Sequence, residues 1–518
     1  MNFVSARRDH RRLAMGSALI TLAFVALLAL AAQAQAATEN IYWDNYKAAP
    51  QSLGFAGIDG SGGGPLNTAG ATFDTPEGMA YDSVTNRLFV GTEVSGLGQI
   101  LFVNLDGSGA GALNVGTAPL ESPEGVAIDP ATRMIYWVNT GTPDTIGFAK
   151  LDGSGGGQLN TTGAVIDNPY KLAIDPVAGR VYWANNENIG YANANNTGGG
   201  GTLDTTGAPT PENITGIVTD PAGGRVYWLD KDSITGRIGF ANLAPGGGGG
   251  EIKLAGVAPF FSQPYGLAFD PSIGRFYWAN YGQDEERAGA IGFANLTGGF
   301  GGISPATAPV NGPQDPVILK SPTGTGAPAV TRAKGSRSTL NCSTGSWAAD
   351  YPGSFVYQAP RTFAYQWTRG GKAVKGATGA KYNAKSAGTY ACVVTAVNQT
   401  GSAAQTSKGL NVKAAKLKLS TKKKANGKPG KVVSFKVKAT NQGDVQSGNA
   451  KVCVKLPKSA KGELKAPKCK SLGKLKGQAK KSATLKIKVL PAAGGTYKAK
   501  FQVKGASGKA AKAKIIVG

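Results

Sequence analysis

The chain has 518 residues, of which 41% are hydrophobic and 76 are glycine, and it carries a formal net charge of +25. This balance favours a loop-rich all-β structure over disorder. The sole histidine, His10, lies in the N-terminal leader. The mature chain therefore excludes Ser-His-Asp and Cys-His catalysis and any zinc site built on histidine.

Residues 1–36 have the three parts of a secretory signal peptide. Four arginines precede an apolar run from Leu13 to Ala32, and Ala34-Gln35-Ala36 offers the small residues needed for cleavage. We expect cleavage after Ala36 and a secreted, extracellular or surface-associated mature protein. Retention as a membrane anchor is the alternative, because the run is long for a signal peptide. No later stretch is apolar enough to span a bilayer.

An aromatic pair recurs at intervals of about 45 to 50 residues, a period typical of propeller blades. The pairs are Tyr42-Trp43, Phe89-Val90, Tyr136-Trp137, Tyr182-Trp183, Tyr227-Trp228 and Tyr277-Trp278. We expect these aromatic residues to pack between blades. The repeated aspartates that end the first strand are expected to fix the next turn through backbone amides. They are Asp129, Asp175, Asp220 and Asp270.

The first repeat begins at its second strand, with Ile41-Tyr42-Trp43. The segment from Val317 to Pro322 matches the first strand of the other repeats. Joining the two ends in one blade would close a ring of six blades over residues 38–322 and leave no exposed edge.

The spacing, the Asp-Pro-x-x-x-Arg-Val-Tyr-Trp-Ala-Asn core and the Asp-Gly-Ser-Gly turn resemble the YWTD (class B) repeats of low-density-lipoprotein receptors. The chain departs from that family at the fourth motif position, where only Asp230 is an aspartate. The resemblance implies a six-bladed propeller that binds macromolecules and is not catalytic.

In such propellers, the loop entering the first strand lines the mouth of the central channel. Its last position is Glu77, Glu124, Tyr170, Thr215 and Tyr265 in successive blades. Two carboxylates facing two tyrosines are suited to a cation, a basic side chain or a sugar face, although a solvated rim without a ligand is the alternative. Loops after the second strand add Glu93 and Asp284. We predict ligand contacts at Glu77, Glu124, Tyr170, Tyr265, Glu93 and Asp284.

A metal-dependent enzyme is the alternative to this binding hypothesis. Gluconolactonase-like propellers hold a divalent metal in the channel with a Glu, Asn and Asp set. Glu77 and Glu124 could begin such a set, but no further ligands are assigned. The sequence therefore predicts no catalytic residue, metal or cofactor.

A Pro/Gly/Thr linker from Pro322 to Pro328 precedes the next domain. Cys342, Trp367 and Cys392 have the order and spacing of an immunoglobulin-type sandwich, and Tyr390 occupies the tyrosine-corner position. Residues 325–413 resemble bacterial surface Ig-like modules, which usually act as spacers or adhesion units.

The four cysteines fall into two local pairs, Cys342 with Cys392 and Cys453 with Cys469. In an exported chain, one pair per domain predicts two disulfides. The alternative, a site of four thiolates, has no C-x-x-C spacing to support it.

Residues 414–518 contain 28 basic residues against only Asp444 and Glu463, and therefore carry about +26 of charge. Apolar and cationic residues alternate in Leu485–Val489 and Tyr497–Lys504, which predicts strands with one lysine-bearing face. The segment resembles the CARDB class of bacterial β-sandwich modules.

We predict an anionic envelope polymer, lipid head group or polysaccharide as its partner. Nucleic acid is disfavoured because arginines and interleaved aromatics are nearly absent. Solubility alone is the other explanation of the lysines.

The sequence thus predicts a six-bladed β-propeller followed by two β-sandwich (Ig-like) domains, in an exported, non-catalytic binding or adhesion protein. Its propeller would recognise an extracellular protein or glycan ligand. The alternatives are a soluble ligand-sensing propeller and a metal-dependent lactonase-like enzyme.

Overall fold

The computed structural model describes residues 39–48, 52–231, 237–244, 246–254, 263–282, 290–305 and 307–518. The expected signal peptide and Asp284 lie outside these residues. Contacts divide the chain into two compact units. Unit 1 combines the chain up to Thr323 with Trp347–Thr362 and Val397–Ala403, and unit 2 comprises Gly324–Ser346, Phe363–Ala396 and Ala404–Gly518. No helix in the described ranges is long and apolar enough to cross a membrane.

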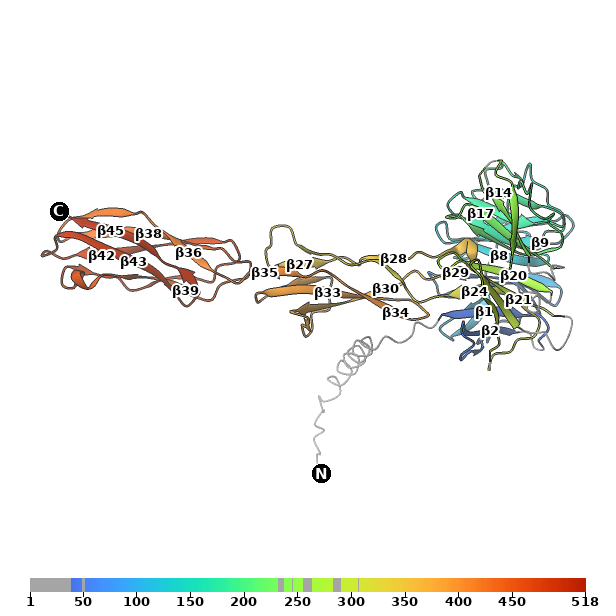
Figure 1. The fold of residues 1–518 in the computed structure, drawn as a ribbon, viewed down its shortest axis with the longest axis horizontal. Coiled ribbons are helices and arrows are strands. Elements are labelled where there is room, and N and C mark those ends of the chain that lie inside the picture. The colour runs from blue at the N-terminus through green and yellow to red at the C-terminus, as the bar shows by residue number, and fades with distance from the viewer. Residues whose placement is uncertain are drawn as a thin grey trace, which may run out of the picture. The chain divides into compact units, whose positions relative to one another are not determined.

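Unit 1 contains six antiparallel blades of four strands each, which confirms the predicted propeller (Figure 1). Five blades follow chain order from the inner to the outer strand. They are β4(Thr75–Asp82)-β5(Arg87–Val94)-β6(Leu97–Asn104)-β7(Gly109–Ala112), β8(Pro123–Asp129)-β9(Met134–Asn139)-β10(Thr145–Lys150)-β11(Gly156–Gln158), β12(Leu172–Asp175)-β13(Arg180–Ala184)-β14(Ile189–Asn193)-β15(Gly201–Thr202), β16(Ile214–Asp220)-β17(Arg225–Asp230)-β18(Arg237–Asn242)-β19(Gly249–Lys253) and β20(Pro264–Asp270)-β21(Arg275–Asn280)-β22(Ala290–Asn295)-β23(Phe300–Ile303).

The sixth blade joins the two ends of the propeller sequence, as the repeat alignment predicted. Its order is β24(Pro313–Leu319)-β1(Asn40–Asn45)-β2(Ser52–Gly57)-β3(Gly64–Pro65). Ile41 pairs with Ile318 and Tyr42 with Val317 in antiparallel register. The inner strand β24 also contacts β20 and β4, so the ring of inner strands is closed.

The recurrent tryptophans and the Ile-Gly-Phe-Ala motif have a common explanation. Trp137 lies opposite Gly147 in the neighbouring strand, and a Cβ atom on Gly147 would approach the indole ring to 2.3 Å. Glycine is therefore required for the ring to lie flat against the third strand. The same pairing joins Trp43 with Gly54, Trp183 with Gly190, Trp228 with Gly239 and Trp278 with Gly292.

In the blade formed by β8 to β11, the residue at the fourth motif position binds the loop that enters the blade. The indole Nε1 of Trp137 and the Nδ2 of Asn139 both donate to the Pro119 carbonyl, at 3.0 and 2.8 Å. Asn139 Oδ1 in turn accepts from the Glu121 amide. An asparagine, which donates and accepts, thus suits a position where the receptor repeats have aspartate.

The aspartates that end the inner strands bind backbone amides two or three residues on, as predicted. Asp129 accepts from Ala131 N, Asp175 from Val177 N, and Asp220 from Gly223 N, each at 2.9 Å. Asp270 accepts from Ser272 N at 3.0 Å. These carboxylates fix the turn between first and second strands.

A later segment of the chain completes the centre of unit 1. It consists of the short 3-10 helix η2 (Pro352–Ser354) and the strand β29 (Val356–Tyr357), which runs parallel to β24. The Ile318 amide donates to the Phe355 carbonyl, and Ser354 Oγ donates to the Thr219 carbonyl. Two segments from the range expected for the Ig-like domain therefore pack with the propeller.

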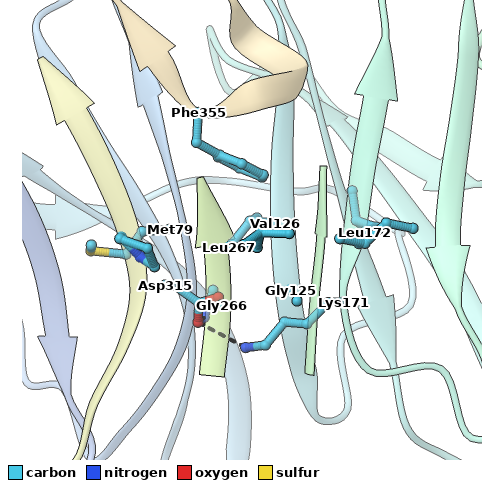
Figure 2. Close-up of a pocket in the computed structure, with 13 residues that line it drawn as sticks. Met79, Gly125, Val126, Lys171, Leu172, Gly266, Leu267, Asp315 and Phe355 are labelled. Atoms are coloured by element: carbon cyan, nitrogen blue, oxygen red, sulfur yellow. Dashed lines mark hydrogen bonds and ion pairs between the residues drawn. The ribbon is translucent and has the colours of Figure 1, made fainter. Parts of the chain in front are cut away.

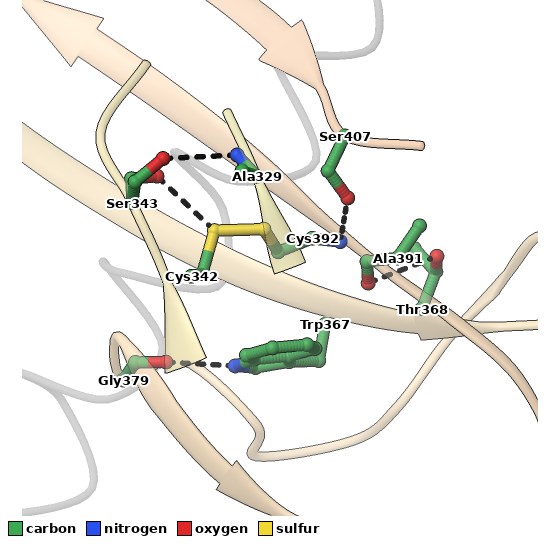
Figure 3. Close-up of a disulfide and its surroundings, with 9 residues drawn as sticks. All are labelled: Ala329, Cys342, Ser343, Trp367, Thr368, Gly379, Ala391, Cys392 and Ser407. Atoms are coloured by element: carbon green, nitrogen blue, oxygen red, sulfur yellow. Dashed lines mark hydrogen bonds between the residues drawn. A yellow bond between two sulfur atoms is a disulfide. The ribbon is translucent and has the colours of Figure 1, made fainter. Parts of the chain in front are cut away.

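The Ig-type elements carry the predicted disulfide and its surroundings (Figure 3). The disulfide joins Cys342 to Cys392, and beside it Trp367, fully buried, donates to the Gly379 carbonyl at 2.8 Å. Tyr390 donates to the Ser386 carbonyl, which confirms the tyrosine corner. The strands are β25(Gly324–Gly326)-β28(Ser346–Trp347), β26(Val330–Arg332)-β27(Thr339–Cys342)-β32(Lys381–Asn383) and β31(Lys372–Ala373)-β30(Thr362–Arg369)-β33(Gly388–Val397)-β34(Ser402–Thr406), with β35(Leu410–Val412) paired to β33.

The lysine-rich segment forms two five-stranded sheets, drawn in orange to red in Figure 1. They enclose an apolar core that includes Phe435 and Phe501, and the second predicted disulfide joins Cys453 to Cys469. The sheets are β40(Leu464–Lys465)-β42(Lys480–Val489)-β38(Val432–Asn441)-β36(Leu417–Ser420)-β44(Gly508–Lys509) and β37(Lys424–Gly427)-β45(Ala511–Val517)-β43(Gly495–Lys504)-β39(Ala450–Lys455)-β41(Lys470–Gly473).

Candidate functional site

Six equivalent positions on the inner strands surround the propeller axis. Four of them are glycine, because neighbouring inner strands approach closely: a Cβ on Gly78 would lie 2.6 Å from the Gly125 Cα. In chain order the positions are Gly78, Gly125, Lys171, Gly216, Gly266 and Asp315. The third and sixth blades therefore carry side chains at a level where the others have none.

Those two side chains form an ion pair across the channel (Figure 2). Lys171 Nζ lies 2.7 Å from Asp315 Oδ2, and the Gly78 amide donates to the same oxygen at 2.7 Å. Inner strands contact one another in chain order, so β12 and β24 stand three blades apart on opposite sides of the ring. The pair thus bridges the axis, and Lys171 is 3% exposed.

The ammonium of Lys171 is held charged. Burial lowers its pKa, but the charges of Asp315, Glu77 and Asp44 outweigh that effect and raise the pKa above the ordinary value. A lysine that keeps its proton is a poor nucleophile, so Schiff-base chemistry at Lys171 is disfavoured.

Phe355 closes the channel on one side of this ion pair (Figure 2). Its ring lines the same cavity as Met79, Val126, Leu172 and Leu267. The volume open to the centre of a water molecule is about 10 Å³, room for no more than about one water. At this level the channel therefore has no room for a ligand larger than water.

Three carboxyl groups gather around the charged pair. Burial raises the pKa of Glu77 to about 7, against the opposing charge of Lys171. Burial and the charge of Glu77 raise the pKa of Glu124 to about 8. Asp44 is fully buried, and burial followed by the charge of Asp315 raises its pKa well above the ordinary value. These carboxyls are consequently protonated in part near neutral pH.

Several of these oxygens lack a hydrogen-bond partner within the described part of the chain. Both carboxyl oxygens of Asp44 and the Oε2 atoms of Glu77 and Glu124 are shielded and unpaired. Thr140 Oγ1 donates to the other oxygen of Glu124 at 3.0 Å. A protonated carboxyl both donates and accepts, so these shielded oxygens keep hydrogen-bonding capacity that the described residues leave unused.

Four tyrosines form a continuous arc beside these carboxyls. Ring centroids are 6.0 Å apart for Tyr170 and Tyr265, 5.0 Å for Tyr265 and Tyr281, and 5.9 Å for Tyr281 and Tyr46. Tyr46 and Tyr281 are partly exposed. Lys47 Nζ lies 3.9 Å from the centroid of Tyr281 and donates to the Gly282 carbonyl at 2.8 Å. The arc therefore offers aromatic surface next to polar groups.

The predicted mouth residues come together in part. Glu77, Glu124, Tyr170 and Tyr265 surround the axis, and the charge of Glu93 acts on Glu77. Asp284 lies outside the described residues. Sequence reasoning missed Lys171, Asp315 and Asp44. The available signal was the loss of the recurrent glycine, which Lys171 and Asp315 replace.

A divalent cation on the axis does not fit these residues. The ammonium of Lys171 already stands among the carboxylates that would serve as ligands, and it would repel a second cation. Within the described ranges, no three His, Cys, Asp or Glu side chains are grouped so as to hold a metal ion.

No protein family model matches the chain, and no curated protein matches it. Among solved structures, a gluconolactonase from Xanthomonas campestris is similar at 14% identity and a TM-score of 0.36, covering 54% of this chain and 85% of that one. A putative 6-phosphogluconolactonase from Bacteroides fragilis is similar at 13% identity and a TM-score of 0.35, covering 60% and 88%. A protein of unknown function from Desulfotomaculum acetoxidans has 12% identity and a TM-score of 0.34, covering 54% and 98%. At these identities the likeness concerns the fold alone.

Proposed function

We propose that the protein is an extracellular binding protein whose propeller mouth recognises a hydroxyl-rich ligand, such as the glycan of a macromolecule. The observation that carries this proposal is the arc of Tyr170, Tyr265, Tyr281 and Tyr46 beside carboxyls whose pKa values are raised. Sugar rings stack their apolar faces on aromatic rings, and their hydroxyls need groups that donate and accept. The mouth offers both kinds of contact.

The extracellular assignment rests on the two disulfides. Cys342–Cys392 and Cys453–Cys469 are both formed, and such bonds persist in oxidising compartments. The secretory signal expected for residues 1–36 supports the same location. We also propose that the propeller repeats are related to the class B receptor repeats and that the lysine-rich domain is related to CARDB modules. The lysine-rich domain is further proposed to dock on an anionic envelope polymer.

Binding of a panel of neutral oligosaccharides to the mature full-length protein, measured by calorimetry, tests the glycan proposal. Replacing Tyr281 by alanine removes the exposed end of the arc and should weaken binding at least about tenfold. Tyr365→Ala, in unit 2, is the matched control and should leave binding unchanged. Equal affinities for the wild type and Tyr281→Ala, or no oligosaccharide bound at all, would reject the proposed site.

A second candidate is hydrolysis of a sugar lactone, the reaction class of the gluconolactonase named above. The favouring observation is the pair Glu77 and Glu124, whose pKa values of about 7 and 8 suit proton transfer near neutral pH. A pH-stat assay with aldonolactones, with and without added divalent cations, tests this candidate. Turnover should disappear in Glu77→Gln and Glu124→Gln. A rate no higher than spontaneous hydrolysis would eliminate it.

A further inference from the structure

The two outer faces of the lysine-rich sandwich carry similar numbers of lysines in different arrangements. On the sheet β37-β45-β43-β39-β41, lysines stand directly opposite lysines. Lys514 pairs with Lys498 and also with Lys424, while Lys500 pairs with Lys512 and with Lys455. All of these side chains are exposed.

These pairings make two adjacent rows of three lysines, here called the six-lysine block. One row is Lys424, Lys514 and Lys498, and the next is Lys512, Lys500 and Lys455. Neighbouring strands lie about 4.8 Å apart, and residues i and i+2 on a strand are about 7 Å apart. The block is therefore a two-dimensional grid of positive charges with those spacings.

The opposite sheet, β40-β42-β38-β36-β44, keeps its lysines apart. Lys436 stands opposite Thr484, Lys438 opposite Ser482, and Lys486 opposite Ser434. Lys418 and Lys480 both face Thr440, from β36 and β42. There are two exceptions: Lys488 meets Lys465 of β40, and Lys418 meets Lys509 of β44. This face therefore spreads a comparable charge in isolated lysines and two separate pairs, without rows of three directly opposed ammonium groups.

No acidic side chain of residues 414–518 neutralises the positive charge of the six-lysine block. The only acidic residues in 414–518 are Asp444 and Glu463. Asp444 accepts from Arg332 at 2.8 Å and from the Lys413 amide at 2.9 Å. Glu463 accepts from the Tyr497 hydroxyl. Like charges directly opposite each other destabilise a sheet, so an unneutralised block costs stability until anions cover it.

We infer that the six-lysine block is the docking face of this domain, and that it takes a linear polyanion whose phosphates or carboxylates recur about every 5 to 7 Å. The inference rests on the proposed docking of the domain and deepens it by naming the face and the ligand geometry. Lysine is a point charge that meets phosphate and carboxylate oxygens from many directions, which suits a flexible polymer.

Other anionic partners fit the block less well. Single-stranded nucleic acid is usually held by aromatic stacking as well as charge, and the block contains only lysines. Interfacial membrane binding usually adds apolar or aromatic side chains that enter the lipid. The outward residues next to the block include Thr496, Asn426 and Gln502, with Ile516 as an apolar exception. A linear polymer lying along the rows needs neither feature.

The test compares two full-length variants that lose the same charge. The first replaces the six lysines of the block by glutamine. The control makes the same replacement at Lys418, Lys436, Lys438, Lys480, Lys486 and Lys488 on the opposite sheet. Binding of inorganic polyphosphate and of polygalacturonate is measured by calorimetry at low and high salt. Both probes are linear, and comparing them distinguishes a phosphate polymer from a carboxylate polymer.

We expect the block variant to lose at least about tenfold in affinity for one or both polymers, and the control to stay within about threefold of the wild type. Thermal unfolding of each variant checks that the domain still folds. Equal losses in the two variants would overturn the inference, because net charge alone would then explain binding. Absence of polymer binding by the wild type would also overturn it, as would preference for anionic vesicles or single-stranded DNA over both polymers.

The same variants separate this inference from the proposal for the propeller mouth. Oligosaccharide binding at the tyrosine arc should be unchanged in both, since neither set of lysines lies in unit 1. Loss of polymer binding with intact oligosaccharide binding supports the block. Failure of oligosaccharide binding in the wild type would reject the mouth and leave the block standing.

Discussion

Val90 and Leu101 lie opposite each other in β5 and β6, at the register position where every other blade pairs a tryptophan with a glycine. Both side chains are buried, at 0% and 2% exposed. The blade β4-β5-β6-β7 thus lacks the indole ring and fills the vacated space from the facing strand. The aromatic repeat and the glycine repeat are two halves of one packing unit, and the blade that loses one half also loses the other.

This relationship predicts the effect of adding a methyl group beneath an indole. A Cβ on Gly239 would approach the Trp228 ring to 2.2 Å, so Gly239→Ala should cost about 1–3 kcal/mol or more of unfolding free energy. Gly64→Ala is the matched control, because no atom lies within 4 Å of a Cβ there. Urea unfolding measures both. Equal stability of the two variants would contradict the packing argument.

The blade β4-β5-β6-β7 offers a reciprocal exchange. Val90→Trp alone should destabilise the protein by overpacking against Leu101, whereas Val90→Trp combined with Leu101→Gly recreates the pairing of the other blades. We expect the double variant to be at least about 1 kcal/mol more stable than Val90→Trp alone. Urea unfolding and the near-ultraviolet dichroism of the new indole are the measurements, and additive destabilisation by the two changes would contradict the exchange.

The ion pair across the axis should be sensitive to the loss of one partner. Lys171→Met leaves Asp315 buried beside Asp44 and Glu77, which should cost about 3–5 kcal/mol. Lys171→Met with Asp315→Leu removes both charges and should be less harmful than Lys171→Met alone. The pair Arg237–Glu251, whose side chains are 52% and 21% exposed, is the comparison, and Glu251→Gln should cost under about 1 kcal/mol there. Equal losses of unfolding free energy in Lys171→Met and Glu251→Gln would mean that the axial ion pair is solvated.

The protonated carboxyls predict a falling stability with rising pH. Their pKa values near 7 and 8 exceed the unfolded value of about 4.3, so the folded protein binds more protons than the unfolded chain between those limits. The contribution is complete at low pH and is lost as pH rises through 7 and 8. Thermal unfolding midpoints should therefore fall between pH 5 and pH 9.

Glu77→Gln with Glu124→Gln should flatten this dependence, leaving the residual slope that comes from Asp44. Glu187→Gln, at an exposed position, serves as the control and should keep the wild-type slope. Identical slopes in all three proteins would mean that the two glutamates are ionised throughout the range.

The closure of the channel by Phe355 predicts a local effect on β24. Phe355→Ala removes a buried ring and should cost about 3–5 kcal/mol. The Ile318 and Lys320 amides donate to the Phe355 and Tyr357 carbonyls, so they should exchange with deuterium faster in the variant. Amides in unit 2, such as that of Cys392, should be unaffected. Unchanged protection at Ile318 would show that β29 does not stabilise β24.

The architecture was accessible from the sequence because its signals are local and repeated. The period of the Tyr-Trp pair predicts the blades, and Val317–Ile318 predicts the strand that closes the ring. The order and spacing of Cys342, Trp367 and Cys392 predict the Ig-type core. Glu77 and Tyr170 were placed at the mouth by their position next to a repeated glycine. The inferences about the propeller needed only the comparison of one repeat with another.

The remainder depends on contacts between residues far apart in the chain. Lys171 and Asp315 are 144 positions apart, and only the ring brings them together. Phe355 lies in a segment whose own pattern is Ig-like, so nothing nearby indicates that it enters the propeller. The six-lysine block depends on strand register, which alternation alone leaves open.

Because β1 pairs with β24, the blade that contains them can be completed only late in the synthesis of the propeller. Asn40–Asn45 leaves the ribosome before its partner Pro313–Leu319, which follows only after the strands of the other blades have been made. Val356–Tyr357 comes later still. During that interval β1 has one open edge, and unpaired edges recruit foreign strands. The first blade begun is therefore the last one finished, and a chaperone or a stray peptide that pairs with β1 competes directly with the protein's own β24.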